Sequence, residues 1–270
     1  MVFSDDSFRN RAHALCWYGF AFQAGAINAG GFLACHSFVS HVTGIGTMVG
    51  IRLAKGETTG ALELLIIPVS FLLGVLISAF LTDRRRMLGK SPAHLTAMGI
   101  IPLLLGFVLI GGHYGLFGIF GEPFVFGRDI LLVSMLCMTC GLQNAYIASA
   151  TRGQIRITHM TGVITDFGLT LVRIRYLRRF SKDRYREILT NRIRFWIFCF
   201  FSTGSALSSI LFIKYEYAGF ALPYATSLIL FGALYLLGPS SVQISQRQIL
   251  RTKILRQKTA GVVFTTGSDR

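Results

Sequence analysis

Charged side chains are scarce in this sequence. Asp, Glu, Lys and Arg make up 14% of the 270 residues, whereas an average soluble domain has roughly 25%. Hydrophobic residues supply 52%, and the mean hydropathy is +0.56. Several apolar runs approach the ~20 residues that cross a bilayer. The composition therefore excludes an ordinary soluble domain and predicts an integral membrane protein.

Acidic residues are the scarcest charged group, with 12 Asp and Glu against 27 Lys and Arg, which gives a net charge of +15. A soluble protein with this charge would suggest nucleic-acid binding, but no aromatic platform for bases accompanies the basic residues. They cluster instead in the polar connections between apolar runs. Membrane topology and anionic lipid explain that placement better, so no nucleic-acid partner is predicted.

The sequence also lacks signs of a disulfide framework, a metal site or an active site. Its five cysteines are odd in number and scattered through apolar segments. Cys137 and Cys140 form a CxxC within a long apolar run, where packing is favoured over a metal or redox role. There is no HExxH, no GxSxG and no nucleotide-binding glycine pattern. We predict no enzymatic activity, no cofactor and no metal.

One polar motif occurs twice. The segment His41–Thr47 (HVTGIGT) recurs 118 positions later as His159–Thr165 (HMTGVIT). Each copy follows a similar lead-in, which is Gly25–Ala29 (GAINA) in the first half and Gly141–Ala145 (GLQNA) in the second. A polar motif duplicated within a hydrophobic chain indicates a membrane protein of two related halves, with its working parts where the copies meet.

Six segments have the length and apolar character of spanning helices. They are Ala14–Ala34, Ala61–Leu81, Ala93–Gly112, Ile130–Ala150, Phe195–Ile213 and Phe220–Leu237. The motif copies lie in two further segments, Val39–Leu53 and Ile157–Val172. At ~1.5 Å per residue these reach only ~24 Å, short of a ~30 Å hydrocarbon core. We expect them to be short re-entrant or broken helices, and a full crossing by each stays open.

The placement of lysine and arginine favours six crossings. With six, 23 basic residues lie on the side of the two termini and 4 on the other; with eight, the split falls to 20 against 7. Three crossings per half would place the second half upside down relative to the first. The predicted fold is therefore all-α and polytopic, with two inverted-topology repeats and both termini in the cytoplasm.

The predicted division of the chain follows from these segments. It comprises a cytoplasmic N-terminal segment 1–13, a first membrane repeat 14–112, an outer loop 113–127, a second membrane repeat 128–238 and a basic cytoplasmic tail 239–270. The second repeat includes a basic cytoplasmic loop, 173–194, in which aromatic and aliphatic residues alternate with arginines. This loop and the tail are typical of interfacial helices on anionic phospholipid, although solvated topology signals fit equally well.

Polar residues at membrane depth are the candidates for function, because hydrocarbon offers them no partner. The predicted solute-binding residues are Asn28, His41, Thr43, Gly44, Thr47, Asn144, His159, Thr161, Gly162, Thr165 and Asp166. Threonine is expected to cap free amides, and glycine to permit unusual backbone angles. Two helices that start near mid-membrane would then point their positive ends at an anion or carboxylate.

Two alternatives apply to these residues. The histidines and threonines would, in the simpler interpretation, only satisfy each other and pin two broken helices together. Asp166 aligns with Met48 and so breaks the symmetry of the copies. It is expected to pair with a histidine or carry a coupling proton, unless it lies at the interface as a solvated acid.

The lead-in and the Thr-Gly motif resemble the YoaK family of bacterial membrane proteins, also known as DUF1275 or UPF0700. The resemblance covers Trp17 to Leu237 and is most specific at Phe38–Thr47 and Gly141–Thr165. It implies a plasma-membrane protein with about six spanning helices, and it implies no substrate.

The leading functional hypothesis is a secondary transporter or channel for a small polar or anionic solute, bound where the repeats meet. The main rival is a non-transporting scaffold or lipid-binding protein that acts through its basic loop and tail. An intramembrane enzyme is a distant third, and a homo-oligomer stays open.

Overall fold

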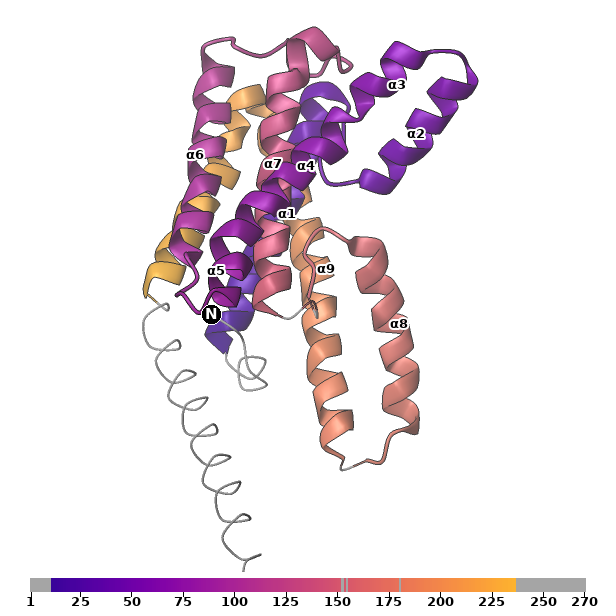
Figure 1. Ribbon diagram of the computed structural model, residues 1–270, viewed down its shortest axis with the longest axis vertical. Helices are drawn as coiled ribbons and strands as arrows, with labels where there is room; N and C mark the ends of the chain where they lie inside the picture. Colours follow the sequence, from indigo (N-terminus) through magenta and orange to yellow (C-terminus); the bar gives the residue numbers. More distant parts are fainter. Residues whose placement is uncertain (1–10, 152, 154, 180, 237–270) are drawn as a thin grey trace, which may run out of the picture.

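The computed structural model describes residues 11–151, 153, 155–179 and 181–236, and every regular element in these ranges is helical (Figure 1). The elements are α1 (Arg11–Cys35), α2 (Val42–Ala54), α3 (Thr58–Leu64), α4 (Ile66–Ala79), the π-helix η2 (Phe80–Arg84), α5 (Arg85–Met87), α6 (His94–His113), α7 (Phe126–Ala150), α8 (Met160–Tyr176), α9 (Lys182–Tyr215), the 3₁₀ turn η3 (Glu216–Phe220) and a helix over 221–236. The predicted basic tail, 239–270, and most of the N-terminal segment lie outside the described residues.

Four helical stretches in the described part of the chain are long and apolar enough to cross a membrane. They are Thr58–Met87, His94–His113, Phe126–Ala150 and Lys182–Leu236. The first joins α3, α4, η2 and α5 end to end. The last contains a reversal, because Glu216 adopts a left-handed φ of 48° at the start of η3. Helix α9 and the helix 221–236 therefore form a hairpin, with the latter beside α6 (Figure 1).

Helices α1 and α9 cross at a pair of glycines. A Cβ on Gly25 of α1 would overlap the carbonyl oxygen of Phe201, and a Cβ on Gly204 of α9 would overlap that of Phe22. Without a hydrophobic driving force in lipid, small residues allow helix backbones to approach and gain van der Waals contact. The glycine of the first lead-in is thus a packing residue.

Helices α4 and α7 cross in the same way. A Cβ on Gly74 of α4 would overlap the carbonyl oxygen of Met138, and a Cβ on Gly141 of α7 would overlap that of Phe71. Gly141 belongs to the second lead-in, as Gly25 belongs to the first. The two closest helix pairs therefore use matching positions of the two halves.

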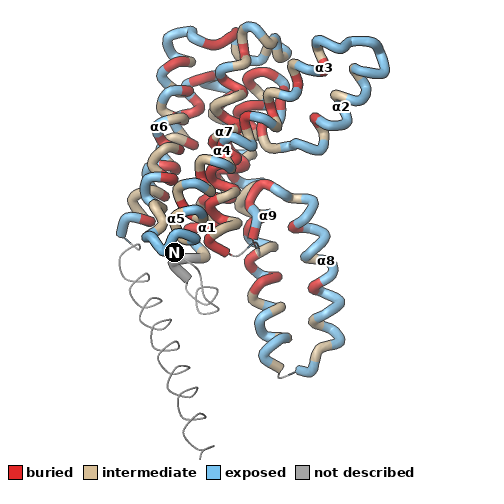
Figure 2. Tube along the Cα trace, in the orientation of Figure 1, coloured by how far each residue is buried: buried red, intermediate tan, exposed pale blue. Residues whose placement is uncertain are grey.

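The buried core runs along α1 and α7, whereas α2, α3 and α8 are largely exposed (Figure 2). We call α2 with α3 the first arm, and α8 with residues 182–194 of α9 the second arm. Each arm is a helical hairpin that packs mainly on itself and leaves apolar side chains such as Ile51 and Val172 exposed. Both arms extend away from the bundle. The ends of the arms nearest the bundle, which we call their bases, therefore border the space between the arms.

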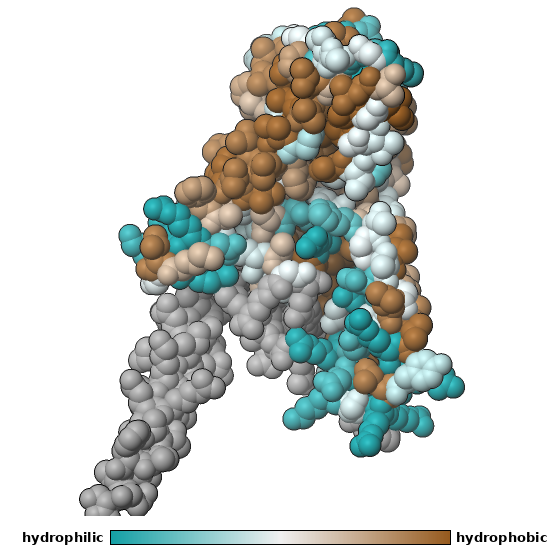
Figure 3. All heavy atoms as spheres, turned by 45° about the vertical axis from the view of Figure 1, so that its right-hand side comes forward, coloured by the Kyte–Doolittle hydropathy of each residue, from teal (hydrophilic) through white to brown (hydrophobic). Residues whose placement is uncertain are grey.

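The basic segment 173–194 is not one continuous helix, which corrects that part of the prediction. Helix α8 ends at Tyr176 and α9 begins at Lys182, where the Ser181 hydroxyl accepts a hydrogen bond from the Arg184 amide (3.2 Å). Helix α9 has 34 residues, well over the ~20 that cross a bilayer. Its basic first turns thus continue the spanning helix, and the second arm ends in the hydrophilic surface at the lower right of Figure 3.

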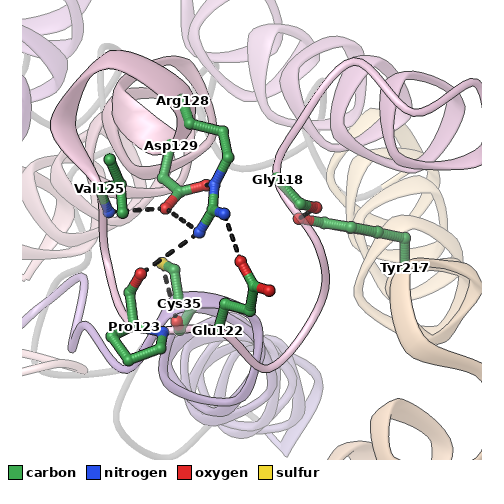
Figure 4. A network of polar contacts seen from close by, with 9 residues as sticks. Cys35, Gly118, Glu122, Pro123, Val125, Arg128, Asp129 and Tyr217 are labelled. Carbon is green, nitrogen blue, oxygen red and sulfur yellow. Dashed lines mark hydrogen bonds and ion pairs between the residues drawn. The ribbon is translucent and has the colours of Figure 1, made fainter.

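A polar network fastens the connection between α6 and α7 (Figure 4). The Asp129 carboxylate is 2% exposed, accepts a hydrogen bond from the Val125 amide (2.8 Å) and pairs with the Arg128 guanidinium (3.1 Å). Arg128 also pairs with Glu122. The Tyr217 hydroxyl donates to the Gly118 carbonyl (2.8 Å) and links the connection to η3. This network fixes the start of α7.

Candidate functional site

A cavity of about 920 Å³ lies between the bases of the two arms and the bundle. We call it the central cavity. Its volume is at the upper end of the range of sites that bind small molecules. Its apolar wall comes from α4 and α9, through Pro68, Phe71, Leu72, Val75, Ile197 and Phe201. Phe71 and Phe201 are also the residues whose carbonyls meet the crossing glycines, so helix packing fixes this wall.

Both copies of the duplicated motif begin a helix at this cavity. His41 is the N-cap residue of α2 and His159 that of α8, and no side chain caps either helix. Helical bonding starts with the Ile45 amide to the His41 carbonyl (3.3 Å) and the Val163 amide to the His159 carbonyl (3.0 Å). Amides of a first helical turn have no partner within the helix and carry partial positive charge. The helices lead away in opposite directions (Figure 1).

The threonines do not cap these helices, so that prediction was wrong. Thr43 and Thr161 lie inside the first turns. One turn later, the Thr47 hydroxyl donates to the Thr43 carbonyl (3.3 Å) and the Thr165 hydroxyl to the Thr161 carbonyl (2.9 Å). A threonine within a helix commonly bonds to the carbonyl four residues back, which turns Thr47 and Thr165 toward their own helix.

The motif glycines do not adopt unusual backbone angles either. Gly44 and Gly162 are helical and are absent from the residues with positive φ. The chain reverses before the motif, where His36 takes a φ of 52° at the end of α1. The reversal therefore occurs at a histidine, which we did not expect at a turn from the sequence.

The lead-in asparagines hold the segments that precede the two helix starts. The Asn28 side-chain oxygen accepts hydrogen bonds from the Ser40 amide (3.3 Å) and hydroxyl (3.0 Å). The Asn144 side-chain oxygen accepts one from the Ile157 amide (3.3 Å). Both asparagines thus pin a loop to the bundle.

The two histidines differ in their surroundings. His159 lies between the Asn144 amide nitrogen and the Arg156 guanidinium, each 3.4 Å from one of its ring nitrogens. His41 instead meets the ring of Phe38 edge-on, with centroids 6.1 Å apart. Phe38 and Arg156 occupy the same position of the two copies, 118 residues apart. The second copy therefore brings a positive charge to the cavity where the first brings an aromatic ring.

Asp166 pairs with an arginine rather than with a histidine, which corrects the prediction for this residue. Its carboxylate lies 3.2 Å from the Arg194 guanidinium of α9, which also donates to the Thr170 hydroxyl (2.9 Å). The Arg194 side chain is 15% exposed and that of Asp166 is 53% exposed. The pairing of α8 with α9 is a tertiary contact that the sequence pattern does not reveal.

The structure brings most of the predicted residues to the cavity wall. Those that line it are Asn28, His41, Thr43, His159, Thr161, Gly162 and Asp166, while Gly44, Thr47, Asn144 and Thr165 do not. Sequence reasoning missed Phe38, Ser40, Arg156, Thr158 and Arg194, which line it as well.

A signal for two of the missed residues was present in the repeat. Ser40 and Thr158 match in the 118-residue register, as polar residues directly before the histidines. Thr158 is 7% exposed, and its hydroxyl has no hydrogen-bond partner among the described residues. A buried hydroxyl without a partner at a cavity wall is a group that a bound solute would satisfy.

Comparison with known proteins identifies a family that the chain matches. The sequence model of a family described as "Protein of unknown function (DUF1275)" matches residues 16–234, a range that contains both arms and every residue named at the cavity. No curated protein and no solved structure matches the chain.

Proposed function

The chain belongs to the DUF1275 family, and from that premise we propose that it is a secondary transporter or channel for a small anionic solute held in the central cavity. The observation that carries this proposal is the meeting of two uncapped helix starts, at His41 and His159, at one cavity. Helix starts attract anions through free amides and the helix dipole. Arg156 and Arg194 line the same cavity and add positive charge.

The shape of the cavity favours an anion with a short apolar body. Its charged end would lie against the amides of α2 and α8 and the Arg156 guanidinium. The remainder would contact the apolar wall that includes Phe71 and Phe201. A small carboxylate has this combination of groups, since convergent polar groups orient a ligand that apolar side chains surround.

The topology that we propose has six crossings in two inverted halves. The four apolar stretches supply five crossings, because the turn at Glu216 divides Lys182–Leu236 in two. Helix α1 supplies the sixth, as it has 25 residues and packs along α9. The opposite directions of α2 and α8 and the matched glycine crossings support inversion. Alternating access would then be rocking of one half against the other.

The orientation that we propose places the basic end of the second arm in the cytoplasm of a bacterium. Arginines and lysines concentrate at that end and in the segment 84–90, which starts at the last residue of η2. Basic residues near membrane spans remain on the cytoplasmic side of the inner membrane. The first arm and the network around Asp129 would then face the outer side.

A thermal-shift screen of the purified protein against small carboxylates and phosphates tests the proposal. We expect at least one anion to raise the unfolding temperature, since a ligand that binds only the folded state stabilises it. The His159→Ala variant should lose this shift, whereas Gly46→Ala, at an open position of α2, should keep it. Uptake of the same anion into proteoliposomes then separates transport from binding. A panel without any stabilising anion would contradict the proposal.

A lipid-binding scaffold is the second candidate, and the exposed arginines at the end of the second arm favour it. Arg175, Arg178 and Arg179 are exposed there, and each basic residue near an anionic surface adds about 1 kcal/mol of attraction. Replacing all three with glutamine should abolish binding to phosphatidylglycerol vesicles if the protein is a scaffold. For a transporter, the same variant should keep the anion-dependent thermal shift.

A further inference from the structure

A second cavity, of about 640 Å³, lies between α8 and α9 toward the basic end of the second arm. Three arginines, Arg173, Arg186 and Arg194, line it together with two acids, Asp183 and Glu187. Arg173 and Glu187 form an ion pair there (3.7 Å). Arg194 lines both this cavity and the central cavity. The two spaces are therefore neighbours that share one guanidinium.

The shared guanidinium is held by an acid at the central cavity. Arg194 pairs with Asp166 (3.2 Å) and donates to Thr170 (2.9 Å), both on α8. These bonds connect α8 to α9 where the central cavity ends and the second cavity begins. An anion that followed the surface between α8 and α9 from one space to the other would pass beside Arg194 and the carboxylate of Asp166.

The first arm has no such ion pair. The position that matches Asp166 is Met48, 118 residues earlier. Helices α4 and α9 can be aligned at their crossing glycines, Gly74 and Gly204. In that alignment Leu64, which is buried, matches Arg194. The charged contact therefore exists at only one of two otherwise matching places.

We propose that the second cavity is an anion-binding vestibule on the cytoplasmic side, and that the Asp166–Arg194 pair is the barrier between it and the central cavity. This inference rests on the proposed function, because it describes a path to the same solute. The vestibule arginines concentrate anions. An arriving carboxylate or phosphate group competes with Asp166 for Arg194, whose planar guanidinium binds such groups through two parallel hydrogen bonds. Once Arg194 has exchanged partners, the contact between α8 and α9 opens.

Access of a thiol reagent to the central cavity tests the barrier without any transported solute. The probe position is Thr43→Cys, in a Cys199→Ser background because the other four cysteines are buried. Inside-out vesicles expose the cytoplasmic side to an anionic methanethiosulfonate. We expect Asp166→Asn to raise the rate of modification at least about threefold, the scale on which a partly exposed ion pair acts. Glu57→Gln, at the start of α3, is the matched control and should leave the rate unchanged.

The vestibule is tested with the same probe and two reagents. Arg186→Gln should slow modification by the anionic reagent and leave a neutral reagent of similar size unaffected, since only the anion is concentrated by charge. Arg194→Lys keeps the charge but loses the forked geometry, so it should raise the rate less than Asp166→Asn. It also serves as the second barrier variant if Asp166→Asn does not fold.

Equal rates in the parent and in both barrier variants would overturn the inference, as would faster modification from the outer side than from the cytoplasmic side in every variant. A slower reaction of both reagents in Arg186→Gln would also overturn the vestibule, since that indicates a structural change. A failed anion screen in the thermal-shift experiment leaves these rates measurable, so failure of the proposed function and failure of the barrier are distinguishable.

Discussion

Gly25 of α1 and Gly204 of α9 each lie where the backbone of the other helix comes closest, so neither position has room for a Cβ. Gly141 of α7 and Gly74 of α4 stand in the same relationship. The carbonyls that meet Gly25 and Gly141 belong to Phe201 and Phe71, and both of these residues line the central cavity. The two crossings therefore set the spacing of the cavity wall.

Replacing a crossing glycine should destabilise the protein and disturb the cavity. Gly25→Ala and Gly141→Ala each force two helix backbones apart, and overpacking of this kind costs about 1–3 kcal/mol. We expect lower unfolding temperatures in detergent and a weaker anion-dependent shift. Gly46→Ala is the control, because nothing lies within 4 Å of its added Cβ; it should gain up to about 1 kcal/mol of helix propensity. Similar effects of all three substitutions would contradict the account of the crossings.

Loss of either lead-in asparagine should release a helix start from the bundle. Asn144→Ala removes the acceptor of the Ile157 amide, and Asn28→Ala removes that of Ser40. The Ile157 amide is buried, and a buried donor left without a partner costs about 1–3 kcal/mol. Ser40 is partly buried, so the loss should be smaller in Asn28→Ala. We expect both variants to unfold at lower temperature and to lose anion binding. Asp129→Asn, in the network at the start of α7, is the control: it should also lower stability but retain anion binding. If this variant lost anion binding as well, the loss in the asparagine variants would reflect lower stability alone.

The two motif copies should contribute unequally to anion binding. Arg156→Gln removes a charge that lies 3.4 Å from His159, and a hydrogen bond to a charged group contributes about 1.5–3 kcal/mol. We therefore expect affinity to fall about tenfold or more in a calorimetric titration with the best anion from the screen. The matched position in the first copy carries no charge, so Phe38→Leu should change affinity much less. Equal losses in the two variants would indicate that the arginine acts only through packing.

Sequence reasoning located the helices and the motif well because both depend on local pattern. The apolar runs predicted α6 and α7 to within a few residues, and the duplicated motif marks two helix starts at one cavity. The 118-residue register also matches Ser40 with Thr158, although neither was singled out.

Two further omissions concern contacts between distant parts of the chain. The partner of Asp166 was missed because Arg194 lies on a different helix, 28 residues away, in a segment whose basic composition suggested a separate surface helix. The lead-in glycines were not identified as crossing points, because periodicity does not reveal which backbone approaches them. Tertiary packing decides both outcomes, and a single sequence carries little trace of it.

The most direct test of the central claim is protection of both helix starts by one anion. Thr43→Cys and Thr161→Cys, each in the Cys199→Ser background, place a thiol in the first turn of α2 and of α8 at the cavity. The anion that most raises the unfolding temperature is added before a thiol reagent, and the modification rates are compared with and without it. We expect the same anion to slow modification at both positions over the same concentration range. Protection at only one position, or at neither, would contradict the central claim.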